Sequence, residues 1–248
     1  MSKFQIFSTA EIDTVRRAGR ILADCLRLTA AEVRAGVTTK DLDAFAEQYI
    51  LAQGGLPAFK GYRNYPSTLC ISVNDECVHG LPGPRMLHDG DIVSLDGGVL
   101  LDGLYTDACV TVSVGPVSAD AQRLLNTTND ALAAALEVVR AGATVGDVSS
   151  AVEKTAKKGG CKVLHALTGH GLGHTLHQFP DIPNYGKAGK GPTFPANTVV
   201  AIEPILSLGT EQVRDTADGW TILTADGSLA AHSEHTILVT ADGCEVIA

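Results

Sequence analysis

The sequence lacks the features of a membrane or exported protein. Its longest apolar runs are short or interrupted by polar residues, far below the roughly 18 to 20 residues that span a bilayer. The N-terminal segment contains no apolar stretch typical of a secretory signal. Instead, Glu11 follows Ser8 at the spacing of a capping box, which predicts the start of a helix. We therefore expect a cytoplasmic protein without membrane contact.

Paired cysteines, excess positive charge and several catalytic signatures are also missing. The six cysteines form no C-x-x-C pair, which excludes a zinc ribbon or a thioredoxin-type dithiol and favours reduced structural thiols. A formal net charge of -9 argues against a broad nucleic-acid-binding surface. The chain contains no H-E-x-x-H, G-x-S-x-G or P-loop motif. A cysteine nucleophile is an alternative that these absences do not exclude, although nothing around Cys70 or Cys77 indicates an activated thiol.

What the chain does have is a globular composition and an internal repeat. Its 248 residues, 45% hydrophobic and 19% charged, fit one large domain or two small ones. Apolar periodicity predicts two consecutive helices in each half, at residues 9–33, about 39–52, 118–139 and about 145–158.

The junctions between these helices also match in sequence. The motif R-A-G-x-T-x-x-D occurs at residues 34–41 and again at 140–147. At the same offset, Glu47 and Gly54 reappear as Glu153 and Gly160. The glycine of the motif is expected to end one helix in a left-handed conformation, and the threonine to support the next start. This pattern indicates a duplicated unit, with chance similarity of two helix-turn-helix segments as the alternative.

The segment SLDGGVLLDGLYTD at residues 94–107 contains two unusually placed carboxylates. Asp96 lies inside an apolar run typical of a buried strand, and Asp107 opens a second strand after a glycine-containing turn. If the strands pair as a hairpin, the two carboxylates come close on one face and need a cation or a shared proton. The alternative is that both lie on a solvated face.

The repeat links these carboxylates to two glutamates in the second half. Shifted by the repeat offset, Asp96 falls within one residue of Glu203, which also lies in an apolar strand-like run. Glu234 follows in another strand pattern. A fold with pseudo-two-fold symmetry would bring all four carboxylates to one centre, where they need cations to coexist.

Histidines in the glycine-rich segment LTGHGLGHTLHQFP offer a nitrogen ligand. His170, His174 and His177 alternate there with glycines that permit close backbone approach. A single histidine is more often a satisfied polar residue than a ligand, but His170 becomes the natural nitrogen donor beside four carboxylates. An oxygen-rich set with one imidazole suits Mn, Fe(II), Co or Zn, and bridging carboxylates favour two ions roughly 3.5 to 4 Å apart.

Together these motifs resemble those of the type I methionine aminopeptidases. They are CVHGLPG at 77–83, SLDGG with Asp107, TGHGLGHTLH, AIEP at 201–204 and SEHTILVT at 233–240. The resemblance covers nearly the whole chain and implies an α+β duplicated pita-bread fold, whose pseudo-two-fold antiparallel sheet is covered by two helix pairs. It also implies a single catalytic domain at residues 1–248, with halves at about 8–115 and 116–248.

The resemblance implies a role for each matching residue. Two divalent ions would be held by Asp96, Asp107, His170, Glu203 and Glu234, with Asp107 and Glu234 bridging both ions. A metal-bridging water would attack the scissile carbonyl while Glu203 takes its proton. His177 would polarise that carbonyl, and His79 would contact the substrate and assist proton transfer. His174 receives no role.

The resemblance also implies a methionine pocket formed by Phe59, Tyr62, Tyr65, Cys70, Leu176 and Trp220. Aromatic walls and a soft sulfur suit a flexible thioether. Without the resemblance, ordinary packing would explain Tyr62 and Tyr65. The sequence departs from the family pattern at Gln178, where many members carry Glu, and at Leu176, which replaces a common aromatic residue. The glycine pair after Asp96 also occurs in proline-specific relatives.

The implied function is removal of the initiator methionine from nascent proteins, with preference for a small second residue. The implied enzyme is a monomer that contacts the ribosome transiently and binds no specific nucleic acid. One alternative is a proline-directed aminopeptidase or prolidase, which usually carries a large N-terminal domain that this chain has no room for. Another is a non-enzymatic binding module, against which the intact ligand set argues.

Overall fold

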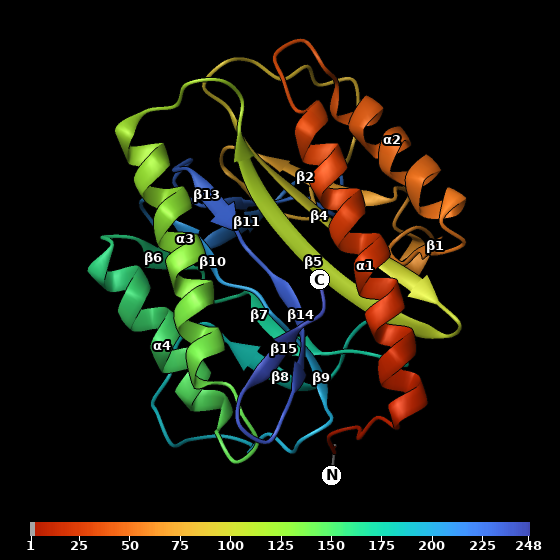
Figure 1. Ribbon diagram of the computed structural model, residues 1–248. Coiled ribbons are helices and arrows are strands. Elements are labelled where there is room, and N and C mark those ends of the chain that lie inside the picture. The colour runs from red at the N-terminus through yellow and green to blue at the C-terminus, as the bar shows by residue number, and fades with distance from the viewer. Residues whose placement is uncertain (1–2) are drawn as a thin grey trace.

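The computed structural model describes residues 3–248, in which two helix pairs flank a central group of strands (Figure 1). One pair consists of α1 (Thr9–Glu32) and α2 (Thr39–Ala52), and the other of α3 (Ala119–Val138) and α4 (Val145–Lys158). These bounds agree to within one residue with the helices expected from the sequence. No helix in the described range is long and apolar enough to cross a membrane.

Both helix pairs are joined by the same local structure. Gly36 and Gly142 have φ angles of 86° and 90°, a left-handed conformation that glycine adopts without steric cost. Thr38 and Thr144 then cap the following helix, each in a reciprocal capping box with the aspartate three residues further on. The repeated motif therefore marks a repeated structure.

The first half contributes five strands around a long hairpin. They are β1 (Leu56–Pro57), β2 (Leu69–Val73), β3 (Glu76–Val78), β4 (Ile92–Leu101) and β5 (Leu104–Ser113). β4 and β5 form the hairpin that crosses the middle of the molecule (Figure 1), and β1 and β2 both pair with β4. The expectation that Asp107 opens the second strand is wrong. A tight turn at Asp102 and Gly103 pairs Leu104 with Leu101, so Asp107 lies inside β5.

The second half contributes ten strands. They are β6 (Lys162–Val163), β7 (Thr168–Gly171), β8 (Gln178–Pro183), β9 (Val199–Ile202), β10 (Ile205–Ser207), β11 (Val213–Asp215), β12 (Ile222–Thr224), β13 (Ala230–His232), β14 (His235–Val239) and β15 (Cys244–Val246). One sheet has the order β15-β14-β9-β7-β8 and another β13-β10-β6, while β12 pairs with β11 and with β3 of the first half. Every pairing between the named strands is antiparallel.

Each helix pair packs on the strands through its own apolar cluster. Leu22 of α1 and Leu42 of α2 pack in one cluster with Leu95 of β4, and all three are buried. Burying such a side chain contributes roughly 1.5–3 kcal/mol. Because successive side chains of a strand point to opposite faces, Asp96 points away from this cluster. The α+β fold implied by the resemblance is thus confirmed.

Candidate metal centre

The β4–β5 hairpin places Asp96 and Asp107 on the same face of the sheet. Asp96 pairs with Cys109, two residues beyond Asp107, so the two carboxylates are diagonal neighbours. Their exposed fractions are only 8% and 4%. The expectation of a shared face is confirmed, and the alternative of a solvated face is wrong.

Glu203 and Glu234 lie at breaks between strands, whereas the sequence predicted that both lie within strands. Glu203 separates β9 from β10, and Glu234 separates β13 from β14. Because β9 pairs with β14 and β10 with β13, the two breaks face each other. Pro204 has no amide hydrogen to donate to a ladder, which favours an interruption there. Both glutamates line the same cavity.

The two halves of the chain are hydrogen-bonded to each other at these residues. The amide of Glu234 donates to the carbonyl of Cys109 over 3.0 Å. The hydroxyl of Thr236 donates to the carbonyl of Asp107 over 2.6 Å, and the amide of Asp107 donates to that hydroxyl over 2.8 Å. One main-chain hydrogen bond and the Thr236 hydroxyl therefore fix the strands that carry the carboxylates of the two halves against each other.

His170, on β7, presents a free ring nitrogen to the carboxylates. Its Nδ1 lies 3.0 Å from the carbonyl oxygen of Gly171, which can only accept, so Nδ1 carries the proton and Nε2 keeps its lone pair. That Nε2 lies 3.8 Å from Oδ2 of Asp107 and 3.4 Å from Oε1 of Glu203. Burial lowers the pKa of His170 to about 4, so the ring is neutral at neutral pH, the form that binds metal ions.

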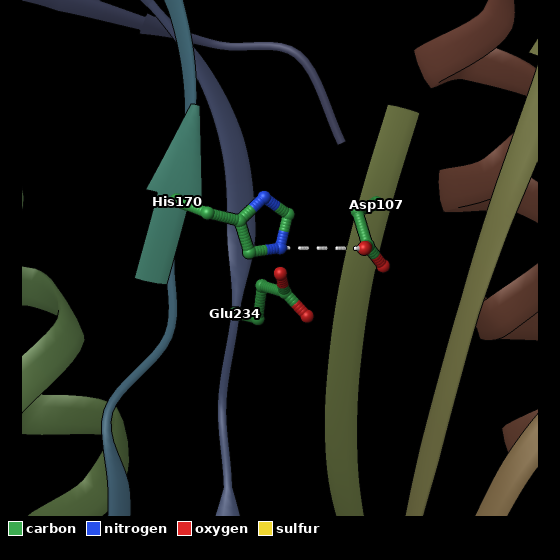
Figure 2. A group of neighbouring side chains, drawn as sticks. All are labelled: Asp107, His170 and Glu234. Atoms are coloured by element: carbon green, nitrogen blue, oxygen red, sulfur yellow. Dashed lines mark ion pairs between the residues drawn. The ribbon is translucent and has the colours of Figure 1, made fainter. Parts of the chain in front are cut away.

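Three of these side chains are close enough to share one ion. Each of Asp107, His170 and Glu234 offers a ligand atom, and the three atoms lie within 4.8 Å of one another. Figure 2 shows the three side chains converging from separate segments of the chain, with a dashed line between Nε2 of His170 and Oδ2 of Asp107.

Burial raises the pKa of all four carboxyl groups. The pKa of Asp107 rises to about 7. The pKa values of Asp96, Glu203 and Glu234 lie well above their usual range because of burial first and of the neighbouring carboxylates second. Within residues 3–248, Oδ1 of Asp96 and Oδ1 of Asp107 are buried without a hydrogen-bond partner. Orphaned carboxylate oxygens beside one imidazole fit a divalent cation, which would favour the charged carboxylates.

The carboxylates open into a cavity of about 390 Å³. All residues predicted to form the site line it: Phe59, Tyr62, Tyr65, Cys70, His79, Asp96, Asp107, His170, Leu176, His177, Glu203, Trp220 and Glu234. The apolar members form one cluster, in which Tyr62 and Trp220 pack against the buried residues. The rings of Tyr65 and Trp220 meet edge to face at 5.1 Å. An apolar pocket therefore adjoins the polar centre.

Two further imidazoles lie at the junction of the pocket and the polar centre. The ring of His177 lies 4.3 Å from that of His170, and its Nδ1 lies 3.0 Å from the hydroxyl of Tyr62. Partial burial and then the nearby His170 lower the pKa of His177. Burial also lowers the pKa of His79, whose backbone takes a positive φ of 59°. Both rings are therefore neutral at neutral pH.

His174 has a structural contact outside the cavity lining. Its ring stacks on Phe7 at 5.6 Å, and its Nε2 lies 2.9 Å from Oε1 of Glu11. The other oxygen of Glu11 accepts from the amide of Ser8 in the capping box of α1. His174 therefore ties the loop between β7 and β8 to the start of the first helix.

The structure adds His232 to the polar centre, which the sequence did not indicate. His232 ends β13, is 2% exposed and lines the cavity. Burial lowers the pKa of its imidazole to about 3. In the sequence, His232 stands two positions before Glu234, a spacing that places two side chains on one face of a strand. Because any strand contains this spacing, it did not mark His232 as a site residue. The other unpredicted lining residues are Arg63, Val78, Ala166, Leu167, Thr168 and Ile205.

Comparison with known proteins identifies a matching family and close relatives. Residues 13–241 match the model of metallopeptidase family M24. The chain is 41% identical over 237 residues to a methionine aminopeptidase of Clostridium perfringens, with 96% of this chain and 95% of the relative covered. The crystal structure of a methionine aminopeptidase from Thermotoga maritima superimposes with a TM-score of 0.98 at 39% identity, covering 99% of both chains.

A more distant structural match concerns the fold alone. Prolidase from Pyrococcus furiosus superimposes with a TM-score of 0.79 at 20% identity, covering 98% of this chain and 64% of that chain. At that identity the likeness shows a shared fold and carries no statement about substrate.

Proposed function

The chain belongs to metallopeptidase family M24 and, within it, to the methionine aminopeptidases, and we propose that it removes the initiator methionine from nascent polypeptides. The bond broken is the peptide bond between a free N-terminal methionine and a small second residue. The observation that carries this proposal is a single cavity in which four carboxylates and His170 adjoin an apolar, largely aromatic cluster.

Five residues would hold two divalent ions. They are Asp96, Asp107, His170, Glu203 and Glu234, all of which line the cavity. Mn, Fe(II), Co and Zn all suit this donor set. The chemistry that such ions supply is a water of lowered pKa and polarisation of the scissile carbonyl. The raised pKa values and unpartnered oxygens of the carboxylates support a site built for cations.

Side chains around the ions would move protons and stabilise charge. Glu203 accepts the proton of the attacking water and returns it to the leaving amine, a role that suits a carboxyl whose pKa is raised by burial. His177 donates from Nε2 to the developing oxyanion, with the Tyr62 hydroxyl 3.0 Å away as the proposed donor to its Nδ1. His79 contacts the peptide from another part of the cavity wall and assists proton transfer.

The apolar cluster would take the methionine side chain. Its walls combine the rings of Phe59, Tyr65 and Trp220 with the thiol of Cys70, and aromatic and sulfur contacts favour a thioether. Leu176 is buried in the same wall. The fit of a thioether among these residues supports methionine as the residue released.

Hydrolysis of three peptides tests this function. Protein loaded in turn with Mn, Fe(II), Co or Zn is given Met-Ala-Ser, Ala-Pro-Ala and acetyl-Met-Ala-Ser, and released amino acid is measured. We expect methionine from the first peptide, no release from the second, and no release from the third because its amine is blocked.

Two results would overturn the proposal. Release of alanine from Ala-Pro-Ala without release of methionine from Met-Ala-Ser would indicate a proline-directed peptidase. No turnover of any peptide with any of the four metals would indicate a binding module.

A further inference from the structure

His232 carries a fully buried ring nitrogen at the polar centre that has acidic neighbours and no hydrogen bond. Its Nε2 is buried without a partner among residues 3–248. The same atom lies 3.5 Å from Oε2 of Glu234 and 3.9 Å from Oε2 of Glu203. An unpaired buried polar group is destabilising, so a side chain at this place needs a compensating role.

The backbone of His232 is fixed in place. Its amide donates to Oγ1 of Thr111 over 3.0 Å, and its carbonyl accepts from the same hydroxyl over 2.6 Å. It also pairs with Ile205 across β10 and β13. The imidazole therefore stands on a rigid support, and a small rotation of a glutamate side chain would close the remaining distance.

The two oxygens of Glu203 face different imidazoles. Oε1 lies 3.4 Å from Nε2 of His170, whose lone pair is free to bind an ion. Oε2 faces Nε2 of His232. A carboxylate that binds an ion through one oxygen needs a hydrogen-bond donor on the other to fix its orientation. A neutral imidazole supplies that donor when its proton is on Nε2, since the alternative tautomer would turn a lone pair toward two carboxylates.

We propose that His232 is a positioning residue of the metal centre, whose Nε2–H holds the carboxylates of Glu203 and Glu234 in the orientation that binds ions and accepts the proton of the attacking water. The proposal rests on the proposed function. It assigns His232 a hydrogen bond to the ligands and no direct bond to an ion.

Two amide substitutions separate this role from simple packing. In His232→Gln the side-chain nitrogen can reach the place of Nε2, whereas in His232→Asn the shorter side chain reaches only the place of Nδ1. Both variants are polar and neutral, so a comparison between them isolates the position of the N–H group. Mn(II) binding is measured by calorimetry, and kcat and KM are measured with Met-Ala-Ser.

We expect His232→Asn to weaken Mn(II) binding and to lower kcat by roughly 10- to 100-fold, with KM changed much less. His232→Gln should stay within about fivefold of the wild type in both measurements, since it keeps a donor at the same place. Thermal unfolding in EDTA checks that both variants fold.

Two outcomes would overturn the proposal. Wild-type Mn(II) affinity and kcat in His232→Asn would show that the N–H group has no role. Equal impairment of His232→Gln and His232→Asn would show direct ligation or packing by the imidazole. Should the wild type hydrolyse none of the peptides, the proposed function fails, while the Mn(II) affinities of the two variants still decide the role of His232.

Discussion

The hydroxyl of Tyr62 lies 3.0 Å from Nδ1 of His177, which connects the apolar pocket to the imidazole proposed to polarise the scissile carbonyl. A hydroxyl that donates to Nδ1 leaves the ring proton on Nε2, the nitrogen proposed to face the substrate. The rings of the two residues also contact each other at 5.4 Å. We propose that the hydroxyl donates here, so that a residue of the proposed methionine pocket sets the tautomer of a proposed catalytic residue.

Tyr62→Phe should lower kcat for Met-Ala-Ser by about fivefold, the equivalent of one hydrogen bond of about 1 kcal/mol. Mn(II) affinity should stay at the wild-type value, because Tyr62 contacts none of the proposed ligands. Tyr185→Phe serves as the matched control, since Tyr185 stacks on His165 outside the cavity lining. An unchanged kcat in Tyr62→Phe would show that this hydrogen bond does not set the tautomer.

Asp107→Asn should stabilise the metal-free protein increasingly as the pH rises. In the folded wild type the pKa of Asp107 is raised to about 7, whereas in the unfolded chain it is about 3.9. Between these values the folded form holds a proton that the unfolded form has lost, so wild-type stability falls with rising pH. Asparagine does not titrate and avoids this loss.

Thermal unfolding in EDTA from pH 4 to pH 8 measures the effect. The thermal unfolding midpoint of Asp107→Asn minus that of the wild type should increase from about pH 4 and level off above about pH 7. A difference that stays constant across this range would contradict the assignment of Asp107 as a buried carboxyl with a raised pKa.

The two repeat junctions should respond alike to alanine. Gly36 and Gly142 have positive φ and no atom within 4 Å of an added Cβ, so only the backbone penalty of the left-handed region applies. Gly36→Ala and Gly142→Ala should each lower the free energy of unfolding by about 1 kcal/mol. Gly243→Ala is the control, because Gly243 also has free space but no positive φ. Denaturant unfolding that shows no difference between these variants and the control would contradict the duplicated-junction account.

Local signals predicted the helices well. The capping boxes at Ser8, Thr38 and Thr144 lie within a few residues of the helix starts that they determine, and glycine fixes the junctions. The start of β5 was misplaced by three residues, because the turn at Asp102 and Gly103 is a two-residue hairpin turn that pairs Leu104 directly with Leu101.

Contacts between distant segments explain what the sequence did not predict. Glu203 and Glu234 occupy facing strand breaks that exist only once β9, β10, β13 and β14 have paired. The partner of His174 is Glu11, 163 positions away. His232 lies close to Glu203 only because β13 pairs with β10, the strand that follows Glu203. The carboxylates themselves were found because a charged residue inside an apolar run is costly enough to stand out.

Binding of divalent ions by the converging carboxylates is the central claim, and titration of metal-free protein with Mn(II) by calorimetry tests it most directly. The wild type should bind two ions, and Asp107→Ala should lose both binding and turnover, because a proposed ligand of both ions is removed. Absence of binding by the wild type, or wild-type binding by Asp107→Ala, would contradict the account.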